Sequence, residues 1–229
     1  MLLKKYCVER RRKRKIMDEY DLLKEIGRNS IHFIYYDMVE KLSKNINAYK
    51  KALKSIYNRL DLIDYIDDDI KEDNVYDQEY KLIRKLEKIE LRVQQDSISC
   101  IVFSALAIEA YIYDYGARRL GDVFVKDHID KLDLISKIII ILKLVLFVDF
   151  PKDSKIYFNL KNLIKSRNNL VHYKSRNQSD KTLMEASDLR DVEFVELLKN
   201  ALQAHETIIN FAKFMIENDS RENAVCQIY

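Results

Sequence analysis

Glycine and proline are scarce in this sequence, whose 229 residues include only three glycines and one proline. Soluble proteins usually contain far more of both, because tight turns and bulges depend on them. Their scarcity therefore argues for a handful of long helices and few loops. Hydrophobic residues make up 48% of the chain and charged residues 34%, a balance typical of amphipathic helices rather than of a disordered chain. The length is sufficient to bury a core without disulfides or metals.

Cysteine is also rare. Cys7, Cys100 and Cys226 lie far apart, are odd in number and have no spacing typical of metal ligands. Cys100 lies in an apolar run, so we expect it to be a small core residue. The pattern fits a reducing compartment, and no apolar stretch of a secretory signal follows the basic cluster near the N-terminus. We therefore expect a soluble, cytoplasmic protein.

The most apolar stretch of the chain is too short for a membrane span. The most apolar stretch, Ile138 to Val148, is interrupted by Lys143, whereas a bilayer requires about 20 residues. We expect a buried core helix there and no membrane partner. The net charge of +3 is small, so charge alone does not demand a nucleic-acid partner.

Several chemical motifs are missing. There is no Gly-rich phosphate loop, no GxSxG, no HExxH and no Cys/His cluster. The acidic stretch 67–74 lacks the glycine of a calcium loop, so we interpret it as a solvated turn. The histidines are isolated in sequence, and we predict neither a metal site nor a cofactor. These histidines are His32, His128, His172 and His205.

Residues 1–28 look like a separate segment, because Glu9 to Lys15 form a dense basic run and the segment ends at Gly27. One interpretation is an arm that reaches nucleic-acid phosphates. The other is a solvated basic tail, and the sequence does not decide between the two.

Two long helices are predicted next, over residues 30–66 and 75–115, each longer than any other in the chain. The first carries apolar residues at steps of four and three, which is a heptad seam. Its members are Leu42, Ile46, Tyr49, Leu53, Ile56, Leu60 and Ile63. A matching seam follows at Leu82, Leu86, Ile89 and Val93. Two such seams joined by a short acidic turn predict a long antiparallel helical hairpin over residues 29–96.

The rest of the chain is expected to form a helical bundle over residues 97–217, followed by a frayed tail at 218–229. Beyond Ser97 the second helix becomes apolar on nearly all sides, which indicates that it is embedded. Turn and capping residues predict the remaining boundaries. These are a turn at Gly116 and Gly121, a third helix from about Asp127 to Val148, a fourth after Pro151 and a fifth capped by Asp188.

The segment 163–175 carries Arg167, Asn168 and His172. An arginine, a polar residue, three further residues and a histidine form the motif of ribonuclease members of the HEPN family, which this segment resembles in residue types and spacing. The stretches 104–112 and 132–137 also look like the helices before that motif in related bacterial proteins. The resemblance covers roughly residues 97–217. It implies an all-α helical bundle of HEPN type and a ribonuclease site formed by a homodimer.

The chemistry of these residue types supports RNA cleavage without metal. The neighbouring 2′-hydroxyl then acts as nucleophile, and a histidine is suited to moving its proton near neutral pH. The planar fork of an arginine is suited to the charge that develops on the phosphate. We therefore expect Arg167 and His172 to be catalytic, and Asn168 to hold a phosphate oxygen or to orient His172.

Further residues are expected to support this site. Lys165, Lys174 and Arg176 would add attraction for phosphates. Tyr173 directly follows the histidine, whereas HEPN toxins that a partner nucleotidyltransferase modifies tend to carry a tyrosine one position later. That route of control is therefore not expected. Glu109 lies in an apolar run and needs a partner if it is buried, for which Arg167 is a candidate.

Helix geometry complicates the site. Positions five residues apart differ by about 140° around a helix and roughly 7.5 Å along it, so one straight helix does not aim Arg167 and His172 at a common point. A two-fold dimer would bring both pairs into one cleft, as the resemblance implies. The other interpretation is that Arg167 pairs with a neighbouring helix and His172 caps a helix C-terminus.

A second group of residues has two interpretations as well. Tyr111, Tyr113 and Tyr115 with Arg118 and Arg119 would be suited to stacking on single-stranded nucleic acid. Alternatively, the tyrosines fill the edge of a core, and we favour this second interpretation.

Two functions thus remain. The leading expectation is a metal-independent endoribonuclease of the toxin or defence kind, which acts on RNA as a homodimer. The alternative is a catalytically inactive HEPN-like module that binds RNA or protein and uses the long hairpin as docking surface. An antitoxin or another protein partner is left open.

Overall fold

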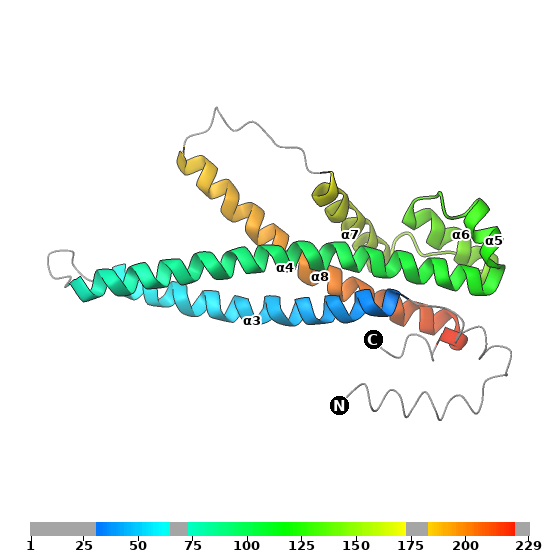
Figure 1. Cartoon of the computed structure of the whole chain (residues 1–229). Helices are drawn as coiled ribbons and strands as arrows, with labels where there is room; N and C mark the ends of the chain where they lie inside the picture. Colours follow the sequence, from blue (N-terminus) through cyan, green and yellow to red (C-terminus); the bar gives the residue numbers. More distant parts are fainter. Residues whose placement is uncertain (1–30, 65–72, 173–182, 223–229) are drawn as a thin grey trace, which may run out of the picture. The chain divides into compact units, whose positions relative to one another are not determined.

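The computed structural model describes residues 31–64, 73–172 and 183–222, and within them all regular structure is helical (Figure 1). The predicted all-α fold is confirmed. The elements are α3 (His32–Asp64), α4 (Asp73–Leu120), α5 (Asp122–His128), α6 (Leu134–Leu146), α7 (Lys155–Val171), α8 (Leu183–Asn218) and the 3-10 helix η2 (Ser220–Glu222).

The chain forms two compact units that share its long helices. Of the described residues, unit 1 comprises 31–36, 104–165 and 206–222, and unit 2 comprises 37–64, 73–103, 166–172 and 183–205. The helix α4 thus passes from unit 2 into unit 1 after Phe103, and α8 does so after His205. Each unit is described by itself below, and only for the residues that the structure describes.

In unit 2, α3 and α4 lie against each other through their apolar seams. The seam residues of α3 are buried or half-buried, and Ile46, Leu53 and Ile56 have almost no exposed surface. Polar contacts flank the seam: Tyr57 Oη donates to Glu90 Oε1 at 2.7 Å, and Asn45 Nδ2 donates to Asp96 Oδ2 at 3.2 Å. In these contacts the later residue of α3 meets the earlier residue of α4.

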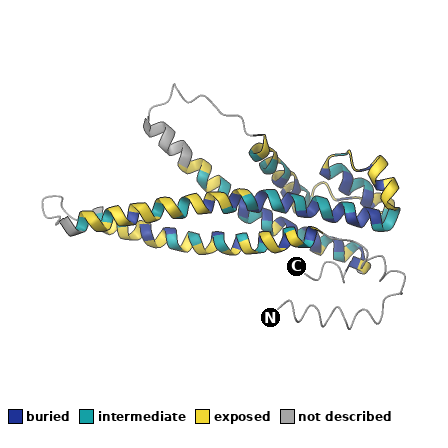
Figure 2. Cartoon of the chain, viewed as in Figure 1, coloured by how far each residue is buried: buried dark blue, intermediate teal, exposed yellow. Residues whose placement is uncertain are grey.

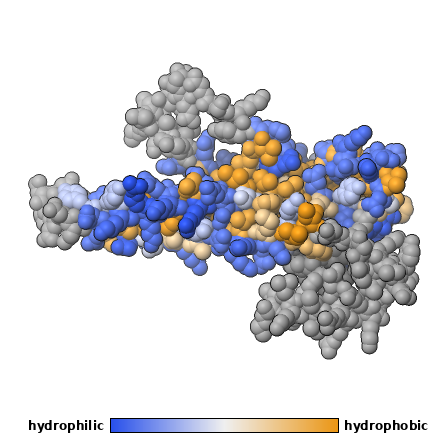
Figure 3. All heavy atoms as spheres, viewed as in Figure 1, coloured by the Kyte–Doolittle hydropathy of each residue, from blue (hydrophilic) through white to orange (hydrophobic). Residues whose placement is uncertain are grey.

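The outer faces of this pair are mainly polar, but they also carry exposed apolar residues, among them Leu62, Leu91 and Ile98. Exposed residues line α3 and α4 away from their contact (Figure 2), and most of the coloured surface at the left of Figure 3 is hydrophilic, with scattered hydrophobic residues. Cys100 is buried, as expected, and its thiol lies 3.4 Å from the carbonyl oxygen of Ala201 on α8.

The lengths of the helices differ in part from the prediction. The helix α4 is the longest described, with 48 residues, but α8 with 36 residues exceeds α3 with 33. The reason is that α8 begins at Leu183 rather than at Asp188, which therefore lies inside the helix.

In unit 1, Gly116 does not end α4 as predicted, because the helix continues to Leu120. A Cβ atom at Gly116 would lie 2.8 Å from Ile141 Cδ1 and 3.3 Å from Val125 Cγ2. The glycine therefore permits close packing of α5 and α6 against α4. The turn forms at Gly121 instead, whose φ of 94° is readily adopted only by glycine.

The predicted third helix is in fact two helices, α5 and α6. Asp127 lies within α5, and the residue that caps α6 is Asp133, whose carboxylate accepts from the Ser136 backbone N–H at 3.1 Å. Hydrogen bonds from Ser136 lower the pKa of Asp133. Helix α6 ends at Phe147, which adopts the left-handed region with φ 58°.

Residues 219–222 also differ from the prediction. A frayed tail was expected from residue 218, yet Asp219 and Glu222 are buried, and the 3-10 helix η2 follows α8 directly. Residues 223–229 and the basic segment 1–28 lie outside the described residues.

One described helix segment, Val75–Leu120, is long and apolar enough to cross a membrane by length and composition. Half of its most apolar 18-residue window is buried inside the protein.

Candidate functional site

The predicted catalytic residues lie at the C-terminal end of α7, in unit 2. Helix α7 ends at Val171, and the backbone N–H of His172 still donates to the carbonyl of Asn168 at 2.9 Å. Because this is the helical bonding pattern, the angular relation of positions 167 and 172 stays that of a helix. Arg167 is half-buried, whereas Asn168 and His172 are exposed. Neither catalytic candidate is thus withdrawn into a core.

Arg167 and Asn168 interact directly. Arg167 Nη1 donates to Asn168 Oδ1 at 3.0 Å, so the amide oxygen holds the arginine in place. Among the residues that the structure describes, no carboxylate forms an ion pair with Arg167. Its remaining N–H groups are therefore available for an anionic ligand.

The supporting residues are placed only in part. Lys165 is exposed on α7, and Tyr173, Lys174 and Arg176 lie outside the described residues. The suggested partner of Glu109 was wrong: its carboxylate contacts the Lys137 ammonium on α6 at 3.0 Å, not Arg167.

Lys137 is the one buried lysine among the described residues. Its Nζ lies 3.0 Å from Glu109 and 3.3 Å from Asp130, and both carboxylates are partly exposed to water. The two carboxylates neutralise the charge of the Lys137 ammonium on the apolar helix α6. A buried ammonium requires such partners, because burying an unpaired charge is costly.

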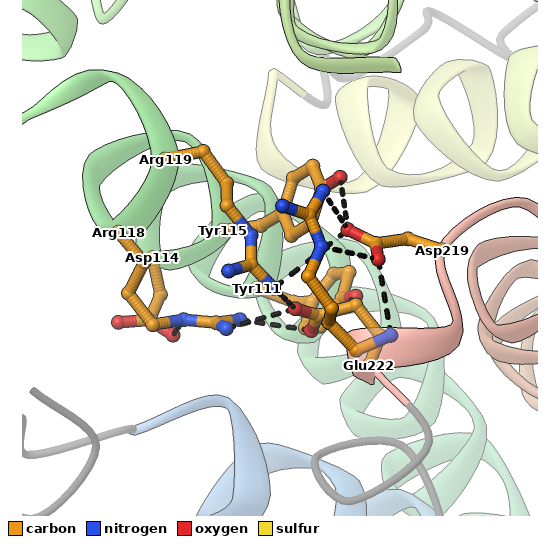
Figure 4. Close-up of polar contacts among 8 residues, drawn as sticks. Tyr111, Asp114, Tyr115, Arg118, Arg119, Asp219 and Glu222 are labelled. Carbon is orange, nitrogen blue, oxygen red and sulfur yellow. Dashed lines mark hydrogen bonds and ion pairs between the residues drawn. The ribbon is translucent and has the colours of Figure 1, made fainter. Parts of the chain in front are cut away.

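A second polar cluster, in unit 1, was not found from the sequence (Figure 4). It joins the C-terminal end of α4 to the residues after α8. The carboxylate of Glu222 is fully buried and accepts from Arg118 Nη1 at 2.8 Å, Arg118 Nη2 at 2.9 Å and Arg119 Nη2 at 2.8 Å. Tyr111 Oη donates to the same carboxylate at 3.0 Å. Four donors thus converge on one carboxylate.

Asp219 and Asp114 complete the cluster. Asp219 accepts from Tyr115 Oη at 2.9 Å and from Arg221 Nε at 2.7 Å. Asp114 accepts from Arg118 Nε at 2.9 Å. Figure 4 shows the arginines of α4 directed towards the carboxylates of the C-terminal segment.

Protonation follows from these contacts. Burial alone would lower the pKa of Arg118, but the hydrogen bonds and charges of Glu222 and Asp114 raise it. Burial would raise the pKa of Asp219, but the hydrogen bonds of Arg221 and Tyr115 lower it. Burial raises the pKa of Tyr115, and the charge of Asp219 adds to this rise. The cluster therefore holds charged arginines, a charged Asp219 carboxylate and a neutral phenol.

His32 lies in the same unit and is 1% exposed. Its ring stands edge-on to Tyr111, with centroids 5.5 Å apart. In the described part of the chain, neither ring nitrogen has a hydrogen-bond partner. Burial lowers the pKa of His32 to about 4, partly opposed by the charges of Asp114 and Glu222. The imidazole is therefore neutral in the folded protein near pH 7.

These contacts distinguish the two interpretations of the tyrosines near the end of α4, a stacking platform for nucleic acid or part of the core. Tyr111 and Tyr115 are buried, so they fill the core, as we favoured, and do not form a stacking platform. Their hydroxyl groups and the two arginines bind the protein's own carboxylates. The sequence offered little to reveal this, because Asp219 and Glu222 follow the last long helix in a polar stretch that looks like a tail.

Within residues 31–64, 73–172 and 183–222, no group of three or more His, Cys, Asp or Glu side chains is arranged to hold a metal ion. No family model, no curated protein and no solved structure matches the chain. What is shown is the class, an all-α protein.

Proposed function

We propose that the chain is a metal-independent endoribonuclease of the toxin or defence kind, with an HEPN-like helical bundle and a cytoplasmic location. The observation that carries this proposal is the arrangement at the end of α7. The exposed His172 ring and the Arg167 guanidinium, held by Asn168, lie one helical turn and a half apart. In this proposal, α3 and α4 form the long antiparallel hairpin.

The roles of the residues follow from their chemistry. His172 would remove the proton of the 2′-hydroxyl, or deliver one to the leaving 5′-oxygen, because an imidazole is suited to both near neutral pH. Arg167 would bind two phosphate oxygens and stabilise the charge of the transition state. The bond that breaks joins phosphorus to the 5′-oxygen, and the product carries a 2′,3′-cyclic phosphate.

A homodimer is part of the proposal. The backbone hydrogen bond of His172 keeps positions 167 and 172 about 140° apart around the helix axis. One copy therefore does not direct both side chains to one phosphate. A second copy placed with its own α7 near a two-fold axis would supply the missing group. A strict monomer at micromolar concentration in light scattering would count heavily against this arrangement.

The decisive experiment compares wild type with His172→Ala on total RNA in the presence of EDTA. We expect wild type to cleave, and His172→Ala to lose cleavage while it keeps its fold, because an exposed residue at a helix end contributes little to stability. Arg167→Lys should also lose most activity, since an ammonium does not reproduce two-pronged phosphate binding. His128→Ala is the matched control, because His128 is exposed on α5. Equal cleavage by wild type and His172→Ala, or loss of cleavage in EDTA, would refute the assignment.

A second function is favoured by a specific observation, an exposed apolar stripe on α4 that Glu87 and Gln94 interrupt. Its residues fall within about 80° of one another around the helix, away from the seam that contacts α3. They are Tyr76, Tyr80, Ile83, Leu91 and Ile98, with exposures from 39% to 57%. Exposed apolar stripes of this kind suit the binding of another amphipathic helix. Under this alternative the chain is a catalytically inactive RNA- or protein-binding module with the hairpin as docking surface.

The same RNA assay separates the two functions. If neither wild type nor His172→Ala cleaves RNA, the binding module becomes the better proposal. Leu91→Glu then tests the stripe, because a charge at a position with 56% exposure leaves the fold intact but opposes helix docking. Unchanged association of Leu91→Glu with any protein partner, an antitoxin included, would remove the stripe from consideration.

A further inference from the structure

The cluster around Glu222 has the composition of an anion-binding site. Two guanidinium groups and one phenol converge on the carboxylate of Glu222 from the last turns of α4. Bidentate guanidinium contacts of this kind are the usual means of binding carboxylates and phosphates. Arg118 and Tyr111 are themselves almost fully buried. The site is therefore preformed by the core of unit 1.

The site also holds one donor that the planar carboxylate does not use. Arg119 Nη2 donates to Glu222, but Arg119 Nε is buried without a partner in the described residues. A carboxylate offers two oxygens, and both are already engaged. A tetrahedral oxyanion has further oxygens outside the plane of its first two. One of them can accept from the unused Nε–H of Arg119, which lies on the same edge of the guanidinium as Nη2.

The local charges favour an anion as well. Besides Glu222, the cluster contains three arginines and the carboxylates of Asp114 and Asp219. Without Glu222, the buried Arg118 would pair with Asp114, and Arg119 would share Asp219, 3.7 Å away, with the half-exposed Arg221. Leaving a largely buried cation without its full counter-charge is costly, so an unfilled site would attract a replacement anion.

We propose that Arg118 and Arg119, together with Tyr111, form a binding site for a tetrahedral oxyanion of the phosphate class. Glu222 fills this site in cis, and the segment 219–222 therefore acts as a plug. Free inorganic phosphate and a phosphate group of RNA share the required chemistry. The binding of free phosphate does not depend on RNA cleavage. Only an RNA phosphate as the ligand rests on the function proposed above.

The test removes the plug and offers phosphate in its place. Thermal unfolding of wild type, Glu222→Ala and the double variant Glu222→Ala/Arg118→Met is followed in inorganic phosphate and in sodium chloride of equal ionic strength. We expect phosphate to raise the melting temperature of Glu222→Ala by about 3–6 °C beyond wild type, at roughly tenfold excess over its dissociation constant. Wild type and the double variant should show only the general stabilisation that phosphate provides through exclusion from protein surfaces.

A matched control is Glu206→Ala, which removes an exposed carboxylate 3.3 Å from Lys155 in the same unit. It should respond to phosphate as wild type does. If Glu222→Ala is unfolded in chloride but folds in phosphate, the rescue supports the site. If it is unfolded in both, the comparison is repeated in an osmolyte that restores folding through its exclusion from protein surfaces, because the emptied site must be kept.

The proposal is overturned if the phosphate response of Glu222→Ala equals that of the double variant, whether or not the osmolyte is present. Glu222 would then be a structural ion-pair partner only. A short RNA oligonucleotide in place of phosphate identifies the source: stabilisation by phosphate alone supports the site for free oxyanions, and stabilisation by both supports it for RNA as well. None of these measurements records RNA cleavage, so the two proposals can fail separately. If wild type does not cleave RNA but Glu222→Ala responds to phosphate, only the ribonuclease proposal is refuted.

Discussion

The buried His32 should make the protein's stability depend on pH between neutrality and pH 4. Its pKa in the folded protein is about 4, against 6.5 for a free imidazole. Above pH 6.5 both the folded and the unfolded state carry a neutral ring, so the group has no effect. As the pH falls from 6.5 to 4, the unfolded state binds a proton that the folded state does not, and the free energy of unfolding decreases.

The size of this decrease follows from the shift. A change of one pKa unit corresponds to about 1.4 kcal/mol, so the 2.5 units between 6.5 and about 4 correspond to roughly 3 kcal/mol at pH 4. The charges that face the ring are Asp114 and Glu222, which favour its protonation, and Arg118, which opposes it. Burial outweighs them, because the ring nitrogens find no hydrogen-bond partner in the described residues.

The assay is urea unfolding, followed by circular dichroism, of wild type and His32→Leu at a series of pH values from 7.5 to 4. Leucine has a similar volume, so we expect the two proteins to differ by less than about 1.5 kcal/mol at pH 7.5. Wild type should then lose about 3 kcal/mol more than the variant by pH 4. Carboxylates that titrate in this range are common to both proteins and cancel in the difference. Parallel stability curves for wild type and His32→Leu would refute the reasoning.

Three further predictions concern unit 1. Glu222→Gln should lower the free energy of unfolding by about 3–5 kcal/mol, because it leaves buried arginines without their full counter-charge, and an effect below 1 kcal/mol in urea unfolding would contradict this. Gly116→Ala should cost roughly 1–3 kcal/mol through overpacking against Ile141, and Ile141→Val in the same chain should restore part of the loss, which a calorimetric comparison of the single and double variants measures. Phe147→Gly should raise the melting temperature by about 1–3 °C, because glycine adopts a φ of 58° without strain, and a lower melting temperature would show that the exposed ring contributes to the fold.

Much of the helical content could be predicted from the sequence, because heptad spacing and the lack of glycine and proline are local properties. The seam residue Leu53 is buried as expected, and Ser154 caps α7 just after Pro151, with its hydroxyl 3.3 Å from the Tyr157 N–H. Gly116 was misassigned because a glycine that permits close packing looks the same in a sequence as one that ends a helix. Only the position of Ile141 distinguishes the two cases.

The site at the end of α7 and the cluster around Glu222 also differ in how far the sequence predicts them. Arg167, Asn168 and His172 lie within one helical segment, so a motif was sufficient to find them, and their catalytic role stays a prediction. The partners of Glu222 lie more than 100 positions away in the chain, and nothing in the sequence pairs Arg118 with a carboxylate near the C-terminus. Long-range charge pairing of this kind is decided by packing, which local patterns do not record.

The exposed ring of Phe147 has a consequence for how the chain can be cut. Its side chain is 83% exposed where α6 ends, and a protease that cleaves after large aromatic residues would find the following peptide bond accessible. Such a nick would separate residues 1–147 from residues 148–229. The contacts of Arg118 and Arg119 with Glu222 would then join two chains instead of two parts of one. The protein would become a pair of complementing fragments, joined by these ion pairs and by core contacts such as that of Tyr111 with Phe211.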